Sequence, residues 1–398
     1  MTRKPDPITQ AVRAGLESDD ATGAVVPPIH LSSTFAFRGF GEKREYDYTR
    51  SGNPTRDLLG AALAELEAGA GAVITATGMA AITLIGHLVP AGSRIVAPHD
   101  CYGGTYRLFN AWEKRGQIRV DFIDFGDEAA LREALSRPAA MVWIETPSNP
   151  LLRITDIEAV TALGRGCGAL VVVDNTFLSP LWQRPIPLGA DVVIHSTTKY
   201  INGHSDVVGG AVIARTPELH EQLTWWANCL GVTGSPFDSF LTLRGLRTLQ
   251  ARLEQHGRNA LAIAEWLTTQ PTVSRVFYPG LATHPGHAIA RRQQSGFGAV
   301  VTAELAGGHE AVRAFASELQ FFSLAESLGG VESLIAHPAT MTHAAMDAEA
   351  RGKAGLTDGL LRLSIGIEAL EDLRADLAAA LERARRATAA PRLKIAEA

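Results

Sequence analysis

The sequence has few cysteines, no long apolar run and no excess of positive charge. Its 398 residues include three scattered cysteines, Cys101, Cys167 and Cys229, too few for a disulfide framework or a thiolate metal site. No stretch approaches the roughly 18 apolar residues of a membrane span, and residues 1–12 lack the apolar core of a secretory signal. A net charge of −5 offers no basic surface for nucleic acid or a membrane. We therefore expect a soluble, cytoplasmic protein.

What the sequence does contain is typical of a globular chain. Hydrophobic residues make up 46% and charged residues 20%, a balance that excludes general disorder. The length predicts two or three domains. Residues 1–58 are rich in loop signals such as Pro27–Pro28, and we expect them to form an N-terminal arm that contacts a neighbouring subunit.

From residue 72 onward, short β-branched runs alternate with amphipathic segments. The candidate strands are residues 72–77, 94–99, 120–125, 141–146, 170–174, 191–195 and 210–214, with helical patterns between them such as 78–89 and 155–168. The alternation predicts an α/β fold with a mostly parallel sheet covered on both faces. Because ligands of such sheets bind beyond the carboxyl ends of the strands, the residues that follow each strand form the candidate site.

A smaller α/β region is expected to follow. A single amphipathic helix over about 243–265 leads to candidate strands at 273–279, 297–305 and 360–366, and residues 368–387 are patterned as a terminal helix before a polar tail. We therefore expect three parts, namely the arm (1–58), a large domain that carries the candidate site (59–253) and a C-terminal small domain (254–398).

Charged and hydroxyl side chains gather at two of the predicted strand ends. Asp174 closes one apolar strand, and Lys199 follows the next strand. Taken singly, Asp174 is as readily a helix cap, and Lys199 a surface lysine with its charge in water. Ser196 and Thr198 share one face of an extended segment, so their hydroxyls can hold one anion beside the lysine.

Two further strand ends add an anion site and an aromatic ring. Gly78 and Met79 begin a helix directly after a strand, where backbone N–H groups and the helix dipole favour a phosphate. Tyr102 follows another strand and can stack on a ring. With Asp174 for a ring nitrogen and Lys199 for an aldehyde, these elements describe one ligand. The combination predicts a pyridoxal 5'-phosphate enzyme.

Motifs along essentially the whole chain resemble the Cys/Met-metabolism family of pyridoxal-phosphate enzymes. They include YTRSGNPTR (48–56), ETPSNPLLR (145–153), HSTTKYINGHSDVVGG (195–210) and LAESLGGVESL (324–334). The resemblance implies fold type I, which is aspartate aminotransferase-like, and a homotetramer built as a dimer of dimers with active sites shared across the dimer interface. It implies small-molecule amino-acid substrates, with no nucleic-acid or membrane partner.

The resemblance also implies roles for individual residues. Lys199 would carry the cofactor as a Schiff base, Asp174 would pair with the ring nitrogen and Tyr102 would stack on the ring, so these three would be catalytic. The phosphate would be held by Gly78, Met79, Ser196 and Thr198, and by Tyr48 and Arg50 of the neighbouring subunit. Substrate would be bound by Arg362, Ser327 and Asn149 at the α-carboxylate, and by Glu326 and Arg107.

Within the family, Glu326 favours chemistry at the γ-carbon, because members acting there tend to have an acid at this position. The implied reaction is γ-replacement, which joins O-succinyl-L-homoserine and L-cysteine into L-cystathionine and succinate in trans-sulfuration and methionine biosynthesis. The alternatives are cleavage by a cystathionine γ-lyase, sulfhydrylation of an O-acylhomoserine and, remotely, a catalytically silent regulator or scaffold. Since Ser51 stands where some members have a second arginine, Arg107 or Arg44 is the candidate for the succinyl carboxylate.

Several histidines could be mistaken for metal ligands. His195, His204 and Asp206 lack the short helical spacing of many zinc sites, and Lys199 lies between them. His337 and His343 meet the same objection. We therefore expect no metal site.

Overall fold

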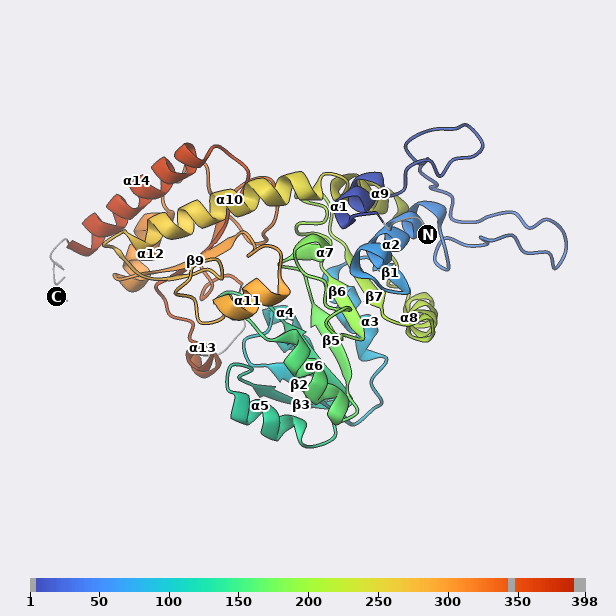
Figure 1. The fold of residues 1–398 in the computed structure, drawn as a ribbon, viewed down its shortest axis with the longest axis horizontal. Coiled ribbons are helices and arrows are strands. Elements are labelled where there is room, and N and C mark those ends of the chain that lie inside the picture. Colours follow the sequence, from blue (N-terminus) through green and yellow to red (C-terminus); the bar gives the residue numbers. More distant parts are fainter. Residues whose placement is uncertain (1–4, 343–347, 390–398) are drawn as a thin grey trace, which may run out of the picture.

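The computed structural model describes residues 5–342 and 348–389, which form two β-sheets of unequal size (Figure 1). The larger sheet has the strand order β1-β7-β6-β5-β4-β2-β3, and β7 alone within it runs antiparallel to its neighbours. Its strands are β1 (Gly71–Thr75), β2 (Ser93–Pro98), β3 (Ile118–Ile123), β4 (Met141–Glu145), β5 (Leu170–Asp174), β6 (Val192–His195) and β7 (Gly210–Ala214). All seven coincide with predicted strands to within two residues.

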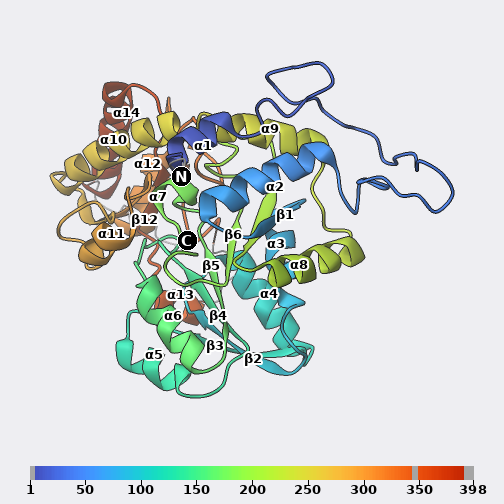
Figure 2. The same cartoon turned by 45° about the vertical axis from the view of Figure 1, so that its right-hand side comes forward.

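Helices cover both faces of this sheet (Figure 2). One face carries α3 (Gly78–Gly86), α4 (Gly103–Lys114) and α8 (Pro217–Leu230), and the other carries α2 (Pro54–Glu67), α5 (Glu128–Leu135) and α6 (Ile157–Gly166). Alternate side chains of one strand therefore enter different cores. Val172 packs on the α3 side, whereas Val171 and Val173 pack on the α6 side, and all three are fully buried. This explains the continuous apolar runs in the sequence.

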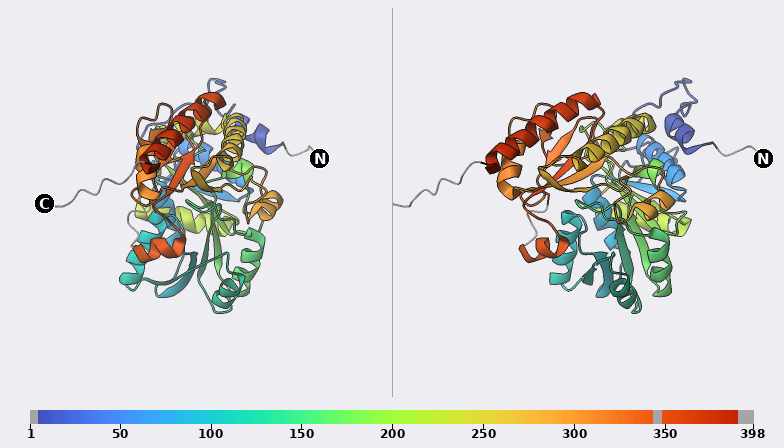
Figure 3. Two further views of the ribbon diagram at one scale, coloured as in Figure 1. Left: turned by 90° about the vertical axis from the view of Figure 1, so that its left-hand side faces the viewer. Right: turned by 60° about the vertical axis from the view of Figure 1, so that its left-hand side comes forward.

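The smaller sheet belongs to the C-terminal part of the chain (Figures 1 and 3). Its order is β10-β11-β12-β9-β8, and α10, α12 and α14 pack against it or one another. The strands are β8 (Val273–Phe277), β9 (Val300–Leu305), β10 (Ser323–Leu324), β11 (Leu334–Ala336) and β12 (Leu360–Ser364); the helices are α11 (His287–Gln293), α12 (Gly308–Ala316), α13 (Ala348–Ala354) and α14 (Leu370–Ala389). The predicted α/β architecture of two unequal parts is thus confirmed, although β10 and β11 are too short to show a periodicity. The predicted polar tail lies outside the described residues.

The single helix predicted over 243–265 is wrong, because the chain forms two helices there. The first, α9 (Pro236–Leu246), is separated by a break from α10 (Leu249–Thr268). At the break, Arg252 donates to the carbonyl of Gly245 at 2.8 Å and to that of Tyr200 at 2.7 Å. A tertiary contact thus takes the place of the helix's own hydrogen bonds. The predicted domain boundary after residue 253 falls within α10 and stays a prediction.

Part of the N-terminal arm, the blue loops in Figure 2, extends away from the body of the molecule. The arm begins with α1 (Pro7–Arg13), a short helix that the loop-rich prediction missed, although Asp6 caps it and Pro7 opens it as helix-start signals should. Beyond it, a bridge between Thr34 and Tyr48 closes a hairpin whose tip exposes Phe40 completely. In the large-sheet part of the chain, the short α7 (Ser179–Trp182) connects β5 to β6. No helix of the described residues is long and apolar enough to cross a membrane.

Candidate active site

A cavity of about 1310 Å³ lies where β4, β5 and β6 of the large sheet end, facing residues of the small sheet. Twelve of the predicted site residues line it: Gly78, Met79, Tyr102, Arg107, Asn149, Asp174, Ser196, Thr198, Lys199, Glu326, Ser327 and Arg362. Because parallel strands deliver their carboxyl ends to one edge, residues far apart in the sequence meet here. Tyr48 and Arg50, which were predicted to act in a neighbouring subunit, do not line this cavity.

Lys199 follows β6 and reaches across to the small domain. Its Nζ donates a hydrogen bond of 2.7 Å to the Ser327 hydroxyl. Burial lowers the pKa of Lys199 to about 8; the positive charge of Arg362 adds to the effect, and Glu326 opposes it. A lysine with such a pKa holds a substantial neutral fraction near neutral pH, so its amine can act as a nucleophile and a base.

Asp174 ends β5 and lines the same cavity as Lys199. Its Oδ1 accepts a hydrogen bond of 3.0 Å from the Thr176 N–H. Burial raises the pKa of Asp174, while the hydrogen bonds from Thr176 oppose that rise. A buried carboxylate in a cavity wall is stabilised when a ligand brings a protonated nitrogen to it.

Glu145 is a buried carboxylate that the sequence interpretation passed over. It ends β4, pairs in register with Asp174 and lines the same cavity. Its Oε2 accepts a hydrogen bond of 2.8 Å from the Tyr102 N–H at the start of α4. Burial, followed by the negative charge of Asp174, raises the pKa of Glu145 well above its usual range. Its position at a strand end, at the head of the motif ETPSNPLLR, was the available signal.

One part of the cavity wall is formed by the start of a helix and by hydroxyl side chains, the groups predicted to hold an anion. Here α3 begins at Gly78, and the Thr77 side chain caps it by accepting from the Ala80 N–H at 2.8 Å. A Cβ placed on Gly78 would lie 2.9 Å from the Cβ of Ser196, so only glycine allows the helix end and the serine to approach so closely. The Thr198 hydroxyl accepts from the Gly209 N–H at 3.0 Å.

Arg362 forms the wall of the cavity opposite the large sheet. This residue of β12 is buried, and it donates to Asn149 Oδ1 at 3.1 Å and to the Ser327 carbonyl at 2.7 Å. Its Nε is buried without a hydrogen-bond partner in the described part of the chain. Burial lowers the pKa of Arg362 to about 10, so it remains a cation at neutral pH. A fixed guanidinium with a donor to spare suits a carboxylate.

The helix α4 supplies one side of the cavity. Burial raises the pKa of Tyr102, and the positive charge of Arg107 opposes the rise. A Cβ on Gly104 would lie 2.4 Å from the Tyr102 ring, so this glycine lets the ring lie against the helix. Asn110 and Lys114, which the sequence interpretation did not single out, continue this polar face along the cavity. Their spacing from Arg107, at i+3 and i+7, was a usable signal.

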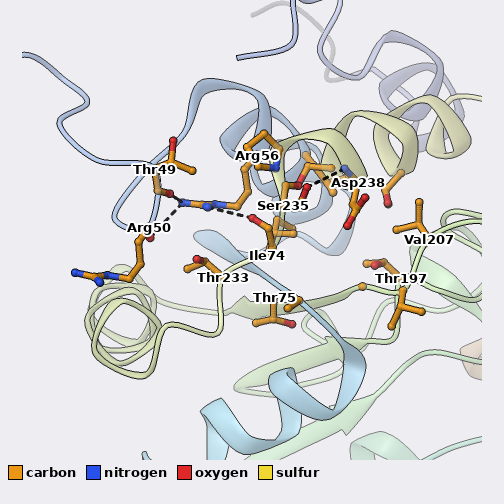
Figure 4. A pocket seen from close by; sticks show the side chains of 18 of the residues that line it. Thr49, Arg50, Arg56, Ile74, Thr75, Thr197, Val207, Thr233, Ser235 and Asp238 are labelled. Carbon is orange, nitrogen blue, oxygen red and sulfur yellow. Dashed lines mark hydrogen bonds between the residues drawn. The ribbon is translucent and has the colours of Figure 1, made fainter. Parts of the chain in front are cut away.

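Tyr48 and Arg50 line a second cavity, of about 460 Å³ (Figure 4). The Arg50 guanidinium lies 5.4 Å from the Tyr48 ring centre, and its Nε donates to Asn228 Oδ1 at 3.0 Å. Figure 4 shows Arg56 in the wall of this cavity, where it donates to the Thr49 carbonyl at 2.6 Å. Within one chain, these arm residues are therefore held apart from the lysine cavity.

The histidines considered as metal ligands have protein partners. His195 lies 2.7 Å from Glu67, and His204 contacts the Asn202 carbonyl at 2.7 Å. Asp206 accepts from the side chain of Asn202 at 2.8 Å. Among the described residues, no group of three His, Cys, Asp or Glu side chains could hold a metal ion. His343 lies outside the described residues.

Comparison with known proteins places this geometry in a family. The family model described as "Cys/Met metabolism PLP-dependent enzyme" matches residues 8–382. The cystathionine gamma-synthase of Escherichia coli K12 is 58% identical over 378 residues, which cover 95% of this chain and 97% of that protein. A crystal structure of the enzyme of this name from Xanthomonas oryzae pv. oryzae, in complex with cystathionine, shares 64% identity with a TM-score of 0.96 and covers 97% of this chain and 100% of its own. A cystathionine beta-lyase of Coxiella burnetii is 47% identical over 94% of this chain and 97% of its own length.

The chain therefore belongs to the Cys/Met-metabolism family of pyridoxal-phosphate-dependent enzymes. The predicted cofactor and the predicted fold type I are both confirmed. The cavity itself fits this cofactor, since it offers a buried carboxylate for a ring nitrogen and a lysine of lowered pKa for an aldehyde. The close approach of Gly78 and Ser196 leaves a helix N-terminus open to a phosphate.

Proposed function

We propose that the protein catalyses γ-replacement, joining O-succinyl-L-homoserine and L-cysteine into L-cystathionine and succinate. The observation that carries this proposal is the position of Ser327 between two functional groups. Its hydroxyl accepts from Lys199 and its carbonyl accepts from Arg362, so a basic amine lies at a fixed place beside a carboxylate-binding guanidinium. That arrangement suits proton transfer at the α-carbon of an amino acid.

When bound, pyridoxal phosphate supplies an aldehyde for the substrate amine and a ring that accepts electrons from the α-carbon. In the proposed reaction, Arg362 and Asn149 orient the α-carboxylate. Lys199 takes the Cα proton and then a Cβ proton, succinate leaves Cγ, and the cysteine sulfur adds there. Lys199 returns protons to the carbon chain before cystathionine leaves. A lysine with a pKa of about 8 can both accept these protons and return them near neutral pH.

The remaining cofactor contacts are proposed from the same geometry. Asp174 holds the ring nitrogen protonated, and Tyr102 packs on the ring face from the start of α4. The phosphate is held by Gly78, Met79, Ser196 and Thr198, all of which line the cavity. Backbone N–H groups and hydroxyls that are already in place can donate hydrogen bonds to this anion with little rearrangement of the protein.

Glu326 and Arg107 are proposed to act on the far part of the substrate. Glu326 lines the cavity, and its negative charge opposes the lowering of the pKa of Lys199 and of Arg362, which supports a role near the reacting carbons. Arg107 lines the cavity on α4 and is proposed to bind the distal succinyl carboxylate. Arg44, the other candidate, instead donates to the Ala36 carbonyl within the arm at 2.9 Å.

We further propose that the enzyme is a homotetramer built from dimers that share active sites. Its arm carries Tyr48 and Arg50, and a second copy would bring both to the partner's phosphate. Exposed apolar arm residues such as Leu31 and Phe40 support burial against another chain. The three cysteines are free thiols, which supports the proposed cytoplasmic location.

A second candidate function is cleavage of cystathionine, because relatives named as lyases share nearly half of their residues with this chain. Purified protein should be incubated with O-succinylhomoserine plus cysteine and, separately, with cystathionine alone. We expect cystathionine and succinate in the first reaction and little cleavage in the second. Rapid cleavage without synthesis would replace γ-replacement by a lyase activity. Product formation only when sulfide replaces cysteine in the first reaction would indicate a sulfhydrylase.

A further inference from the structure

A fully buried polar network lies behind the strand ends that form the cofactor site. Glu67, the last residue of α2, and His195, the last residue of β6, are inaccessible to solvent. His195 Nε2 lies 2.7 Å from Glu67 Oε1, and the Asn175 side chain donates to the same oxygen at 2.8 Å. None of the three lines the cavity, so the reaction described above does not use them directly.

The two residues that Glu67 holds are neighbours of the two anchors for the cofactor. Asn175 directly follows Asp174, the proposed partner of the ring nitrogen. His195 directly precedes Ser196, a proposed phosphate ligand. One carboxylate oxygen on a helix thus ties together the carboxyl ends of β5 and β6. Because the ring nitrogen and the phosphate belong to one small molecule, the spacing of these two strand ends has to match it.

We propose that Glu67 is a positioning residue that sets the separation of Asp174 and Ser196 and thereby tightens the binding of pyridoxal phosphate. Asn175 is well suited to transmit this constraint. Its side chain donates to the Gln183 carbonyl at 2.7 Å and accepts from Gln183 Nε2 at 3.0 Å, so its orientation is determined from two directions.

Stability alone does not account for this arrangement. Glu67 Oε2 and His195 Nδ1 are both buried without a hydrogen-bond partner among the residues that the structure describes. A buried polar pair with unsatisfied atoms is costly, and an apolar pair of similar volume often stabilises a core equally well or better. The Glu67 carboxylate adds two hydrogen-bonding contacts, which join the ends of two neighbouring strands.

The test measures the Kd of pyridoxal phosphate for the apoprotein. Glu67→Ala removes both bonds, and Glu67→Gln keeps one acceptor oxygen but loses the charge. We expect the Kd to rise at least about ten-fold in the alanine variant, as for the loss of hydrogen bonds to a charged group, and by less in the glutamine variant. Glu65→Gln, at an exposed position on the same helix, is the matched control and should leave the Kd unchanged.

A double-mutant cycle separates positioning from a general loss of stability. If Glu67 acts by placing Ser196, then Glu67→Gln should raise the Kd by a smaller factor in a Ser196→Ala background. Far-UV circular dichroism of each apoprotein establishes that it is folded. A Kd for Glu67→Ala within two-fold of the unchanged chain would overturn the proposal. If Glu67→Ala does not fold, the double-mutant cycle with Glu67→Gln is the test. A Kd raised by the same factor in both backgrounds would then overturn the proposal.

Discussion

The lysine cavity and the N-terminal arm are built in opposite ways. In the cavity, predicted site residues such as Asn149 and Arg362 are buried and hydrogen-bonded within one chain. In the arm, apolar side chains such as Leu31 and Phe40 face solvent, and Arg50 lines a second cavity. The core of one chain can therefore fix the proposed cofactor and substrate anchors, while the arm has surface suited to another chain. The difference separates the residues expected to act in the same chain from those expected to act across an interface.

The largest expected effect comes from replacing Lys199, the lysine in the cavity. Lys199→Ala removes both the nucleophile and the base, so we expect turnover to fall by at least about 1,000-fold. Lys199→Arg keeps the charge but not a neutral amine, and it should be equally inactive. Release of succinate from O-succinylhomoserine with cysteine is the measurement. Activity within ten-fold of the unchanged enzyme in either variant would contradict the assignment.

Arg362 is the next largest case. Arg362→Met removes the guanidinium together with its hydrogen bonds to Asn149 and Ser327. We expect kcat/KM for O-succinylhomoserine to fall by roughly 10 to 150-fold, the range for a hydrogen bond to a charged group. The loss should appear mainly in KM. The control variant Glu65→Gln should have the kcat/KM of the unchanged enzyme. An unaltered KM for Arg362→Met would mean that the substrate carboxylate binds elsewhere.

The arm is tested by mixing two defective variants. Arg50→Ala should weaken cofactor binding, and Lys199→Ala should be inactive. If each site combines Lys199 of one chain with Arg50 of another, random exchange into dimers restores about one quarter of the sites. Activity at limiting cofactor should therefore rise above the sum of the separate variants. No gain after demonstrated subunit exchange would confine both residues to one chain's own site and overturn the shared-site proposal.

The sequence alone predicted the large sheet well because its strands are apolar and bounded by helical patterns. The same edge-of-sheet logic found Asp174 and Lys199. It was also applicable to Glu145, which ends a strand but was passed over, whereas Glu67 could not be found because its tertiary partners are not visible in the sequence. The break between α9 and α10 was missed for a related reason, because it depends on Arg252 reaching carbonyls of another segment.

Arg362 shows a further limit of sequence reasoning. Its role came from a family resemblance, since an arginine in a short strand has no special periodicity. Only the fold brings it from β12 to the loop that carries Asn149, more than 200 positions earlier in the chain. The predicted domain boundaries likewise follow from composition alone and remain predictions.

The smallest expected effect is electrostatic and concerns the charges around Lys199. The pKa of Lys199 is about 8, and the negative charge of Glu326 opposes a further lowering. Glu326→Gln should therefore lower the pKa of Lys199 and enlarge the neutral fraction at neutral pH, whereas Arg362→Met should raise it. The pH dependence of Lys199 modification by an amine-reactive reagent in the apoprotein reports the midpoint. A higher pKa of Lys199 in Glu326→Gln, or a lower one in Arg362→Met, would contradict the proposed positions of these charges.

The most direct test of the account is to locate the cofactor on the chain. The protein with bound pyridoxal phosphate should be treated with borohydride, which fixes a cofactor held through a lysine amine, and then digested for peptide mass spectrometry. We predict that the cofactor mass is found on the peptide that contains Lys199 and is absent after Lys199→Arg. Attachment to a different lysine, or none in a protein that retains cofactor, would contradict the central claim.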